Sequence, residues 1–159
     1  MKVLVTGVAG QLGHDVMNEL DRNGIQGIGT DLKPEYAGIQ DGSAVTKAPY
    51  ISLDITDRDA VLDAVKELNP DVIIHCAACT AVDLAEDEDK QPLVKKINVD
   101  GTQNMADAAK AVDAKMVYIS TDYVFNGQGT EPWDPDCKDY APLNVYGETK
   151  LGGELAVSN

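Results

Sequence analysis

The sequence predicts an α/β fold, in which a doubly wound parallel sheet is flanked by helices. Short apolar runs that are typical of buried strands alternate with stretches of helical periodicity throughout the chain. A glycine-rich turn lies between the first strand and the first helix. Because alternating strands and helices join into parallel sheets, we expect these strands to lie side by side in one sheet.

The first strand and the first helix enclose the glycine-rich turn. Residues 2–6 form a buried apolar run, and an amphipathic helix follows that Gly24 ends. Gly7 permits a tight turn, Gly10 lets a pyrophosphate approach the backbone, and Gly13 lets the helix pack on the strand. This arrangement is typical of Rossmann-like dinucleotide-binding domains, in which the pyrophosphate lies at the helix N-terminus. We therefore expect a cofactor to bind at this turn, which comprises Gly7, Gly10, Gln11, Leu12 and Gly13.

The second strand, residues 25–30, ends at an acidic residue. Asp31 can accept hydrogen bonds from an adenosine ribose and would disfavour a 2′-phosphate, whereas the nearby Lys33 would favour one. These residues leave the choice between NADPH and NADH open. Residues 33–49 are polar and contain several glycines and prolines, so we interpret them as a mobile loop.

The third and fourth strands follow the same alternation. Residues 50–53 form the third strand, and an amphipathic helix over residues 60–68 follows, capped by Thr56 or Asp57. Residues 72–75 form the fourth strand, a continuous apolar run that a parallel sheet would bury on both faces.

Small residues follow the fourth strand. Ala77 and Ala78 suit a backbone that lies against a cofactor. We interpret His75, at the end of the strand, as packed or hydrogen-bonded rather than catalytic. Cys76 and Cys79 form a C-x-x-C pair, but they do not open a helix and no second pair accompanies them. We therefore interpret them as small buried thiols and predict no metal site.

The second half of the chain contains one long helix and a fifth strand. Residues 83–90 are acidic, which we interpret as the solvated start of a helix. The apolar stripe of residues 94–112 includes Asn98, which would need hydrogen-bond partners if buried. Residues 115–120 form the fifth strand, and ligands of open α/β sheets bind at its carboxyl end.

Tyr146 and Lys150 are four residues apart on the last predicted helix, so they lie on the same face. A nearby ammonium favours the phenolate, so we expect Lys150 to lower the pKa of the Tyr146 phenol. The pair therefore fits a proton donor to a developing alkoxide.

Composition limits the classes of partner. The chain has 159 residues and a net charge of −14, so it should repel nucleic acid and anionic membranes. It has no apolar run of membrane-spanning length and no signal-peptide pattern, so we expect a cytoplasmic protein. The three cysteines do not suggest a disulfide framework, and only two arginines are available to hold a diphosphate.

In this order, the motifs resemble those of the extended short-chain dehydrogenase/reductase family over nearly the whole chain. The resemblance rests on the glycine-rich turn, Asp31, Asp54-Ile55, Ala77-Ala78, Asn98-Val99-x-Gly101-Thr102 and the Tyr146/Lys150 pair. It implies an NAD(P)-binding Rossmann domain with NADPH or NADH as cofactor. Besides the glycine-rich turn, the implied cofactor contacts are Asp31, Asp54, Ile55, Ala77, Ala78, Cys79, Tyr146 and Lys150.

Within this family, three stretches are similar to those of the dTDP-4-dehydrorhamnose reductases, namely Ser120–Phe125, Pro142–Gly147 and Thr149–Glu154. These enzymes reduce the 4-keto group of dTDP-4-dehydro-L-rhamnose to dTDP-L-rhamnose. The resemblance implies that Thr121 hydrogen-bonds the keto oxygen, Tyr146 protonates it, and Lys150 holds the nicotinamide ribose. It also places Asp122 near the substrate. Donors fixed at that oxygen would stabilise the charge that hydride transfer leaves there.

Two other functions fit parts of the same pattern. The regulatory β subunit of methionine adenosyltransferase, which binds a dinucleotide without catalysis, shares the Thr-Asp-Tyr-Val-Phe stretch and the Tyr-Gly-x-Thr-Lys motif. Nucleotide-sugar epimerases are a lesser alternative, because they typically carry small hydroxyl residues at the positions where this chain has Thr121 and Asp122. A 4,6-dehydratase carries Asp-Glu after the threonine, whereas here Tyr123 follows Asp122, which argues against elimination.

The chain stops soon after the helix of Tyr146. The resemblance therefore implies that residues 1–159 are an incomplete NAD(P)-binding domain, without the substrate domain. We expect an unpaired sheet edge, and cofactor binding with little turnover. The dTDP-sugar would bind to the full-length protein, which is a candidate homodimer, and any magnesium requirement of the family would depend on residues that this chain lacks.

Overall fold

The computed structural model describes residues 1–158 and contains, within them, a five-stranded parallel sheet. The strand order is β3-β2-β1-β4-β5. The strands are β1 (Lys2–Thr6), β2 (Gln26–Asp31), β3 (Tyr50–Ser52), β4 (Val72–His75) and β5 (Lys115–Tyr118). The chain order reverses direction between β1 and β4, which is where ligands bind in doubly wound folds.

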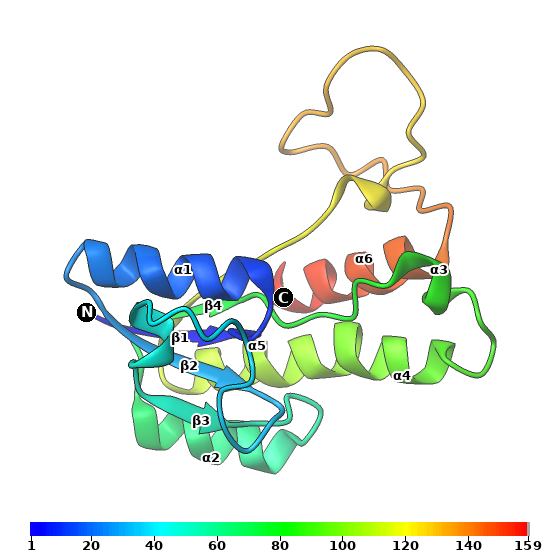
Figure 1. Cartoon of the computed structure of the whole chain (residues 1–159). Coiled ribbons are helices and arrows are strands. Elements are labelled where there is room, and N and C mark those ends of the chain that lie inside the picture. Colours follow the sequence, from blue (N-terminus) through cyan, green and yellow to red (C-terminus); the bar gives the residue numbers. More distant parts are fainter. Residues whose placement is uncertain (159) are drawn as a thin grey trace.

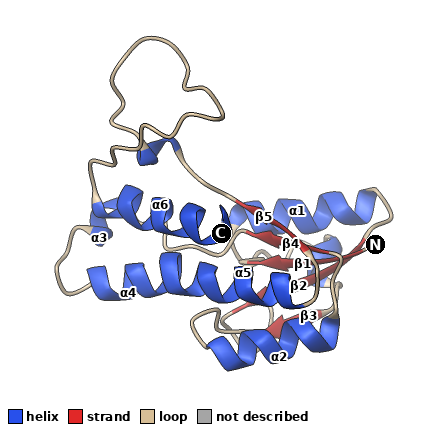
Figure 2. Cartoon of the chain, turned by 180° about the vertical axis from the view of Figure 1, so that it is seen from behind, coloured by secondary structure: helices blue, strands red, loops and turns tan. Residues whose placement is uncertain are grey.

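Helices cover both faces of the sheet, so the predicted fold class is confirmed (Figures 1 and 2). Helix α1 (Gln11–Arg22) packs on one face, whereas α2 (Arg58–Leu68) and α5 (Thr102–Ala111) pack on the other. Helix α6 (Val145–Ser158) lies beside α5 and also contacts β5. Short helices complete the chain, namely α3 (Val82–Ala85), α4 (Gln91–Lys95) and the 3₁₀ turns η1 (Ala44–Thr46) and η3 (Asp122–Val124).

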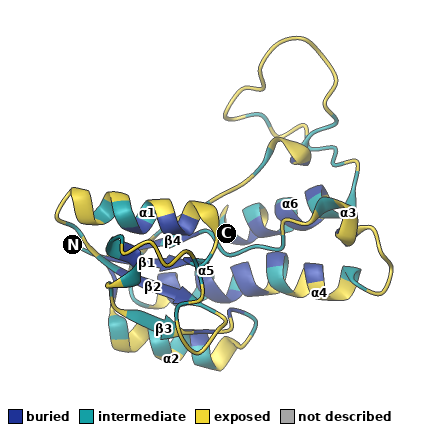
Figure 3. Ribbon diagram, in the orientation of Figure 1, coloured by how far each residue is buried: buried dark blue, intermediate teal, exposed yellow. Residues whose placement is uncertain are grey.

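The core consists of one apolar layer on each side of the sheet. Buried residues lie along the central strands and on the helices beside them (Figure 3). Leu4 and Ile73 point to one side, where they meet Met105 of α5, and all three are fully buried. Val5 points to the other side and packs with Met17 of α1. This alternation along a strand that is covered on both faces explains the continuous apolar runs of the sequence. No helix within residues 1–158 has the length and apolar character needed to cross a bilayer.

Most predicted element boundaries are confirmed to within a few residues. Asp57, one of the two predicted caps of α2, accepts a hydrogen bond from the Ala60 amide at 3.1 Å through its carboxylate. Strand β5 ends at Tyr118, two residues before the predicted end, and the Ile119 carbonyl accepts a hydrogen bond from Lys150 instead. β5 pairs only with β4 within residues 1–158, which agrees with the expected sheet edge.

Two interpretations of polar segments need correction. Only the first of the acidic residues 83–90 lie in a helix, the short α3, and the rest form the turn before α4. The predicted long helix begins only at Gln91 and runs without a break through Lys96–Gly101 into α5. Residues 33–49 are not simply a loop, because they contain η1, and Val45 is buried against the core on the α1 side. A single fully buried apolar side chain in a mostly polar segment gives a weak sequence signal, although it anchors the segment.

A buried threonine on β2 provides a test of the core. The Thr30 hydroxyl is buried and has no hydrogen-bond partner within residues 1–158. We expect Thr30→Val to be neutral or to stabilise the chain by about 0.5–1 kcal/mol in urea unfolding, because it removes an unpaired hydroxyl. The matched variant Thr6→Val should destabilise the chain by about 1–3 kcal/mol, because Thr6 is hydrogen-bonded to His75 and to the Ala77 amide. Equal effects of the two variants would contradict this assignment.

Candidate functional site

A cleft of about 690 Å³ lies at the carboxyl edge of the sheet. It brings together most residues that the sequence singled out as cofactor contacts, from the glycine-rich turn at one end to the α6 helix at the other. The predicted residues that line it are Gly7, Gly10, Gln11, Leu12, Gly13, Asp31, Asp54, Ile55, Ala77, Ala78, Tyr146 and Lys150. Cys79 does not line the cleft, and its backbone is hydrogen-bonded to Asn98 instead.

The three glycines of the turn have different physical roles. Gly7 has φ +71°, and a Cβ there would lie 2.7 Å from the Ala77 amide nitrogen, so only glycine lets the turn touch the end of β4. A Cβ on Gly13 would lie 2.7 Å from the Gly7 carbonyl carbon and 2.8 Å from the Val8 Cα. A Cβ on Gly10 would approach only the Gly7 carbonyl oxygen, at 3.3 Å, and would otherwise project into open space.

The N-terminus of α1 opens onto the cleft. Gly10 is the N-cap residue, so no side chain caps the helix, and its first turn contains no acidic residue. The first backbone N–H groups of a helix lack intrahelical partners and carry partial positive charge. This end of α1 therefore fits the pyrophosphate of a dinucleotide, as does the open space beside Gly10.

Asp31 is oriented by the backbone around it. Its Oδ2 accepts a hydrogen bond from the Ala9 amide at 3.0 Å, and its Oδ1 accepts one from the Leu32 amide at 2.8 Å. These bonds hold the carboxylate beside the glycine-rich turn, where a ribose hydroxyl could donate to it.

Several cleft residues were missed by the sequence analysis. Helix α4 and the π-helical segment Lys96–Gly101 after it contribute Leu93, Lys96 and Ile97 to the lining of the cleft. Their spacing of three and four residues marks one helical face and could have identified them. Further lining residues are Leu32, Leu53, Thr56, Cys76, Thr80, Ile119 and Ser120.

Tyr146 and Lys150 both face the cleft, as their spacing predicted. The expectation that Lys150 lowers the pKa of the phenol is wrong, however. Burial raises the pKa of Tyr146, with smaller increases from Tyr123 and Asp122, and only the Thr121 side chain acts in the opposite direction.

The Lys150 ammonium points to the strand rather than to the phenol. Its Nζ donates a hydrogen bond to the Ile119 carbonyl at 2.6 Å and lies 4.3 Å from the centroid of the Tyr118 ring. Lys150 is almost fully buried, and this burial lowers its pKa to about 8. Because this pKa lies above 7, Lys150 is mostly charged at neutral pH, and the hydrogen bond to the Ile119 carbonyl holds its ammonium beside the cleft.

Thr121 and Asp122 lie outside this cleft, in a neighbouring cavity of about 570 Å³ that shares Ser120 with it. Thr121 Oγ1 accepts a hydrogen bond from the Tyr123 amide at 3.3 Å, which caps η3. Both residues that the sequence suggested as substrate contacts therefore lie beside this cleft rather than in it.

Asn98 connects the cleft wall to the helix of Tyr146. Its Oδ1 accepts a hydrogen bond from the Cys79 amide at 2.8 Å, and its Nδ2 donates to the Cys79 carbonyl and to Thr149 Oγ1. The Thr149 hydroxyl in turn donates to the Tyr146 carbonyl at 2.9 Å. The polar partners that a buried Asn98 requires are thus on the chain itself.

His75 is hydrogen-bonded at both ring nitrogens within the core. The Thr102 hydroxyl donates to the Asn98 carbonyl at 2.8 Å, so its oxygen accepts from His75 Nε2 at 3.2 Å. Nδ1 lies 2.8 Å from Thr6 Oγ1 and accepts a hydrogen bond from that hydroxyl. This confirms that His75 is packed and hydrogen-bonded, in the tautomer that carries its proton on Nε2.

We expect His75 to remain uncharged well below neutral pH. Burial, reinforced by the Lys150 charge, lowers its pKa to about 3. An unfolded histidine takes up a proton near pH 6.5, so this group removes stability as the pH falls from about 6.5 towards 3. The expected loss is about 2–3 kcal/mol by pH 4.5. Histidine NMR of the folded chain checks this, and a His75 signal that titrates near pH 6.5 would contradict it.

Comparison with known proteins agrees with this geometry. The family model described as "RmlD substrate binding domain" matches residues 1–159. The chain belongs to this family. It is 42% identical to a dTDP-4-dehydrorhamnose reductase of Streptomyces griseus, over 97% of this chain and 44% of that protein. It is 36% identical to methionine adenosyltransferase 2 subunit beta of Pongo abelii, over 98% of this chain and 42% of that protein.

A solved structure shows the same architecture. The dTDP-4-dehydrorhamnose reductase of Bacillus anthracis, in complex with NADP, matches with a TM-score of 0.82 at 39% identity. The match covers 99% of this chain and 49% of that one. The chain therefore spans about half the length of the relatives that it matches.

Proposed function

We propose that this chain binds NADPH or NADH in the cleft and forms the cofactor-binding domain of a dTDP-4-dehydrorhamnose reductase. The observation that carries the proposal is that a single cleft joins the glycine-rich turn and Asp31 to Tyr146 and Lys150. One end of the cleft suits a pyrophosphate and an adenosine ribose. The other end, with the phenol of Tyr146 and the ammonium of Lys150, suits the nicotinamide half. These two ends follow one another as the two halves of a dinucleotide do.

The roles of individual residues follow from their places in the cleft. The N-terminus of α1 and Gly10 would hold the pyrophosphate, and Asp31 the adenosine ribose. Asp54 and Ile55 would flank the adenine, and Ala77 and Ala78 the middle of the cofactor. Lys150 would hold the nicotinamide ribose. When bound, the cofactor supplies the hydride.

Tyr146 is suited to donate a proton rather than to hold a negative charge. Because burial raises its pKa, the phenol is protonated at neutral pH. A keto oxygen beside it would gain negative charge during reduction and would receive this proton. Thr121, whose side chain interacts with that of Tyr146, would orient the same oxygen, and Asp122 would lie near the sugar.

Single-turnover oxidation of bound NADPH by dTDP-4-dehydro-L-rhamnose tests the proposal. Because the chain spans about half of its relatives, we expect slow turnover by residues 1–159 alone. Tyr146→Phe should reduce this rate by about 10²-fold or more, while cofactor affinity stays within about threefold. A rate that is unchanged in Tyr146→Phe would exclude Tyr146 as the proton donor.

A second candidate function rests on the similarity to methionine adenosyltransferase 2 subunit beta. In this case the chain would bind a dinucleotide and act through a partner protein without reducing a sugar. Tight binding to a methionine adenosyltransferase, together with no reduction of the 4-keto sugar, would favour this function over the reductase.

Asp31 provides a test of cofactor choice. In Asp31→Asn, the side chain keeps one acceptor for the backbone but loses its charge, so repulsion of a 2′-phosphate decreases. We expect the ratio of NADPH to NADH affinity to rise about tenfold in fluorescence titrations. Asp59→Asn, on the exposed first turn of α2, serves as the control and should leave the ratio unchanged. If Asp31→Asn lowered the affinities for NADPH and NADH equally, this would contradict the role of the charge.

A further inference from the structure

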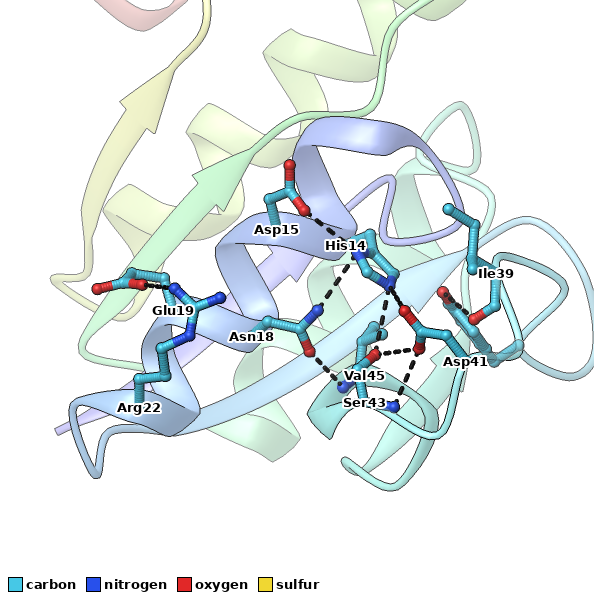
Figure 4. Close-up of polar contacts among 10 residues, drawn as sticks. His14, Asp15, Asn18, Glu19, Arg22, Ile39, Asp41, Ser43 and Val45 are labelled. Atoms are coloured by element: carbon cyan, nitrogen blue, oxygen red, sulfur yellow. Dashed lines mark hydrogen bonds and ion pairs between the residues drawn. The ribbon is translucent and has the colours of Figure 1, made fainter.

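His14 attaches the connection between β2 and β3 to helix α1 (Figure 4). It lies in the first turns of α1 and is only 8% exposed. Its Nε2 is 3.2 Å from Asp41 Oδ2 and 3.3 Å from Ser43 Oγ. One turn later, Asn18 Oδ1 accepts a hydrogen bond from the Val45 amide at 3.1 Å. The segment of residues 36–45, which the sequence suggested to be mobile, is therefore anchored at several points.

The hydrogen bonds define the proton position on His14. The Ser43 hydroxyl donates to the Asp41 carboxylate, so Nε2–H of His14 is the donor to both residues. The Asn18 oxygen is occupied by Val45, so its amide nitrogen faces His14 Nδ1 at 3.3 Å and donates to it. In the neutral state, His14 therefore donates to the segment and accepts from its own helix.

The anchored segment lies against the glycine-rich turn. A Cβ on Gly38 would lie 2.9 Å from the Ala9 Cα, so the two backbones are in close contact there. The Ala9 amide is also the donor that orients Asp31. The segment thus supports, from outside, the part of the cleft that would receive the adenosine ribose.

We propose that His14 is a positioning residue that holds residues 36–45 against the glycine-rich turn and thereby strengthens binding of the adenosine half of a dinucleotide. The inference rests on the proposed binding of the cofactor in the cleft. His14 does not line the cleft itself and acts through Asp41, Ser43 and the contact of Gly38 with Ala9.

Two carboxylates face the His14 ring, Asp15 from α1 at 3.3 Å from Nδ1 and Asp41 from the segment at 3.2 Å from Nε2. Of the other charged groups on this face, Glu19 and Arg22 pair with each other.

Calorimetric titration with ADP-ribose, and with reduced nicotinamide mononucleotide as the other half, tests the proposal. His14→Phe removes both ring nitrogens, so it should weaken ADP-ribose binding about five- to tenfold without changing mononucleotide binding. His14→Gln keeps a donor near Asp41 and should restore most of the ADP-ribose affinity.

Arg22→Gln, which removes only the Glu19–Arg22 pair on the same helix, is the matched control and should behave as wild type. Hydrogen exchange of the Val45 amide provides a readout without ligand, and it should speed up in His14→Phe. Identical exchange and identical ADP-ribose affinities in wild type and His14→Phe would overturn the proposal. A folded wild-type chain that binds no ADP-ribose at all would overturn the proposed function as well.

Discussion

Gly10→Ala is expected to weaken dinucleotide binding by at least about tenfold while the chain stays folded. Gly10 has φ −83° and ψ 166°, a conformation that alanine adopts without strain. Its new methyl group would meet the chain only at the Gly7 carbonyl oxygen and would occupy the space beside the N-terminus of α1. The free energy of unfolding should therefore change by no more than about 1 kcal/mol, whereas a pyrophosphate would be displaced.

Gly13→Ala is the informative comparison, because the same methyl group meets backbone instead of open space. A Cβ there would lie 2.7 Å from the Gly7 carbonyl carbon and 2.8 Å from the Val8 Cα. We expect a loss of about 3 kcal/mol or more in urea unfolding, because neither backbone atom can move without shifting helix or strand. Normal NADH binding by a folded Gly10→Ala chain would contradict the assignment of the pyrophosphate site.

Lys150→Met should make the chain more stable and less able to bind a cofactor. The lysine is 4% exposed, and its lowered pKa of about 8 shows that the folded state disfavours its charge. Replacing it with an apolar side chain of similar length should add about 2–3 kcal/mol of stability at pH 7. Cofactor affinity should fall about tenfold, because a donor to the nicotinamide ribose is lost. A buried charge that costs stability is expected where function requires it.

The pH dependence of the free energy of unfolding separates the removal of the buried charge in Lys150→Met from a general effect of repacking. Between the ordinary lysine pKa of 10.5 and the folded pKa of about 8, the unfolded chain binds a proton that the folded chain does not. The stability advantage of Lys150→Met should therefore be complete below about pH 8 and disappear above about pH 10.5. Lys95→Met, at an exposed position on α4, is the matched control and should change neither stability nor binding. A Lys150→Met chain that is less stable at pH 7 would contradict this account.

Local patterns were sufficient to predict most of the fold. The apolar runs gave the bounds of β1 and β4, because strands covered on both faces need continuous apolar residues. The spacing of Tyr146 and Lys150 correctly placed both side chains on the face that lines the cleft. In these cases the decisive interactions lie within one helix or one strand, so the sequence contains them directly.

Contacts between distant segments could not be predicted in the same way. The pairing of His14 with Asp41 joins a helix to a loop, and no local pattern marks either residue. The direction of Lys150 depends on where β5 ends, because the Ile119 carbonyl becomes available only beyond the last strand residue. This is why the predicted effect of Lys150 on the pKa of Tyr146 was wrong, although both residues were placed correctly.

The central claim is that the cleft binds a nicotinamide dinucleotide, and calorimetric titration of the 159-residue chain with NADH and NADPH tests it most directly. The account predicts one site per chain, with a dissociation constant between about 1 μM and 1 mM, and loss of the signal in Gly10→Ala. A folded wild-type chain that binds neither dinucleotide would contradict the account. A Gly10→Ala variant that binds them as tightly as the wild-type chain would contradict it too.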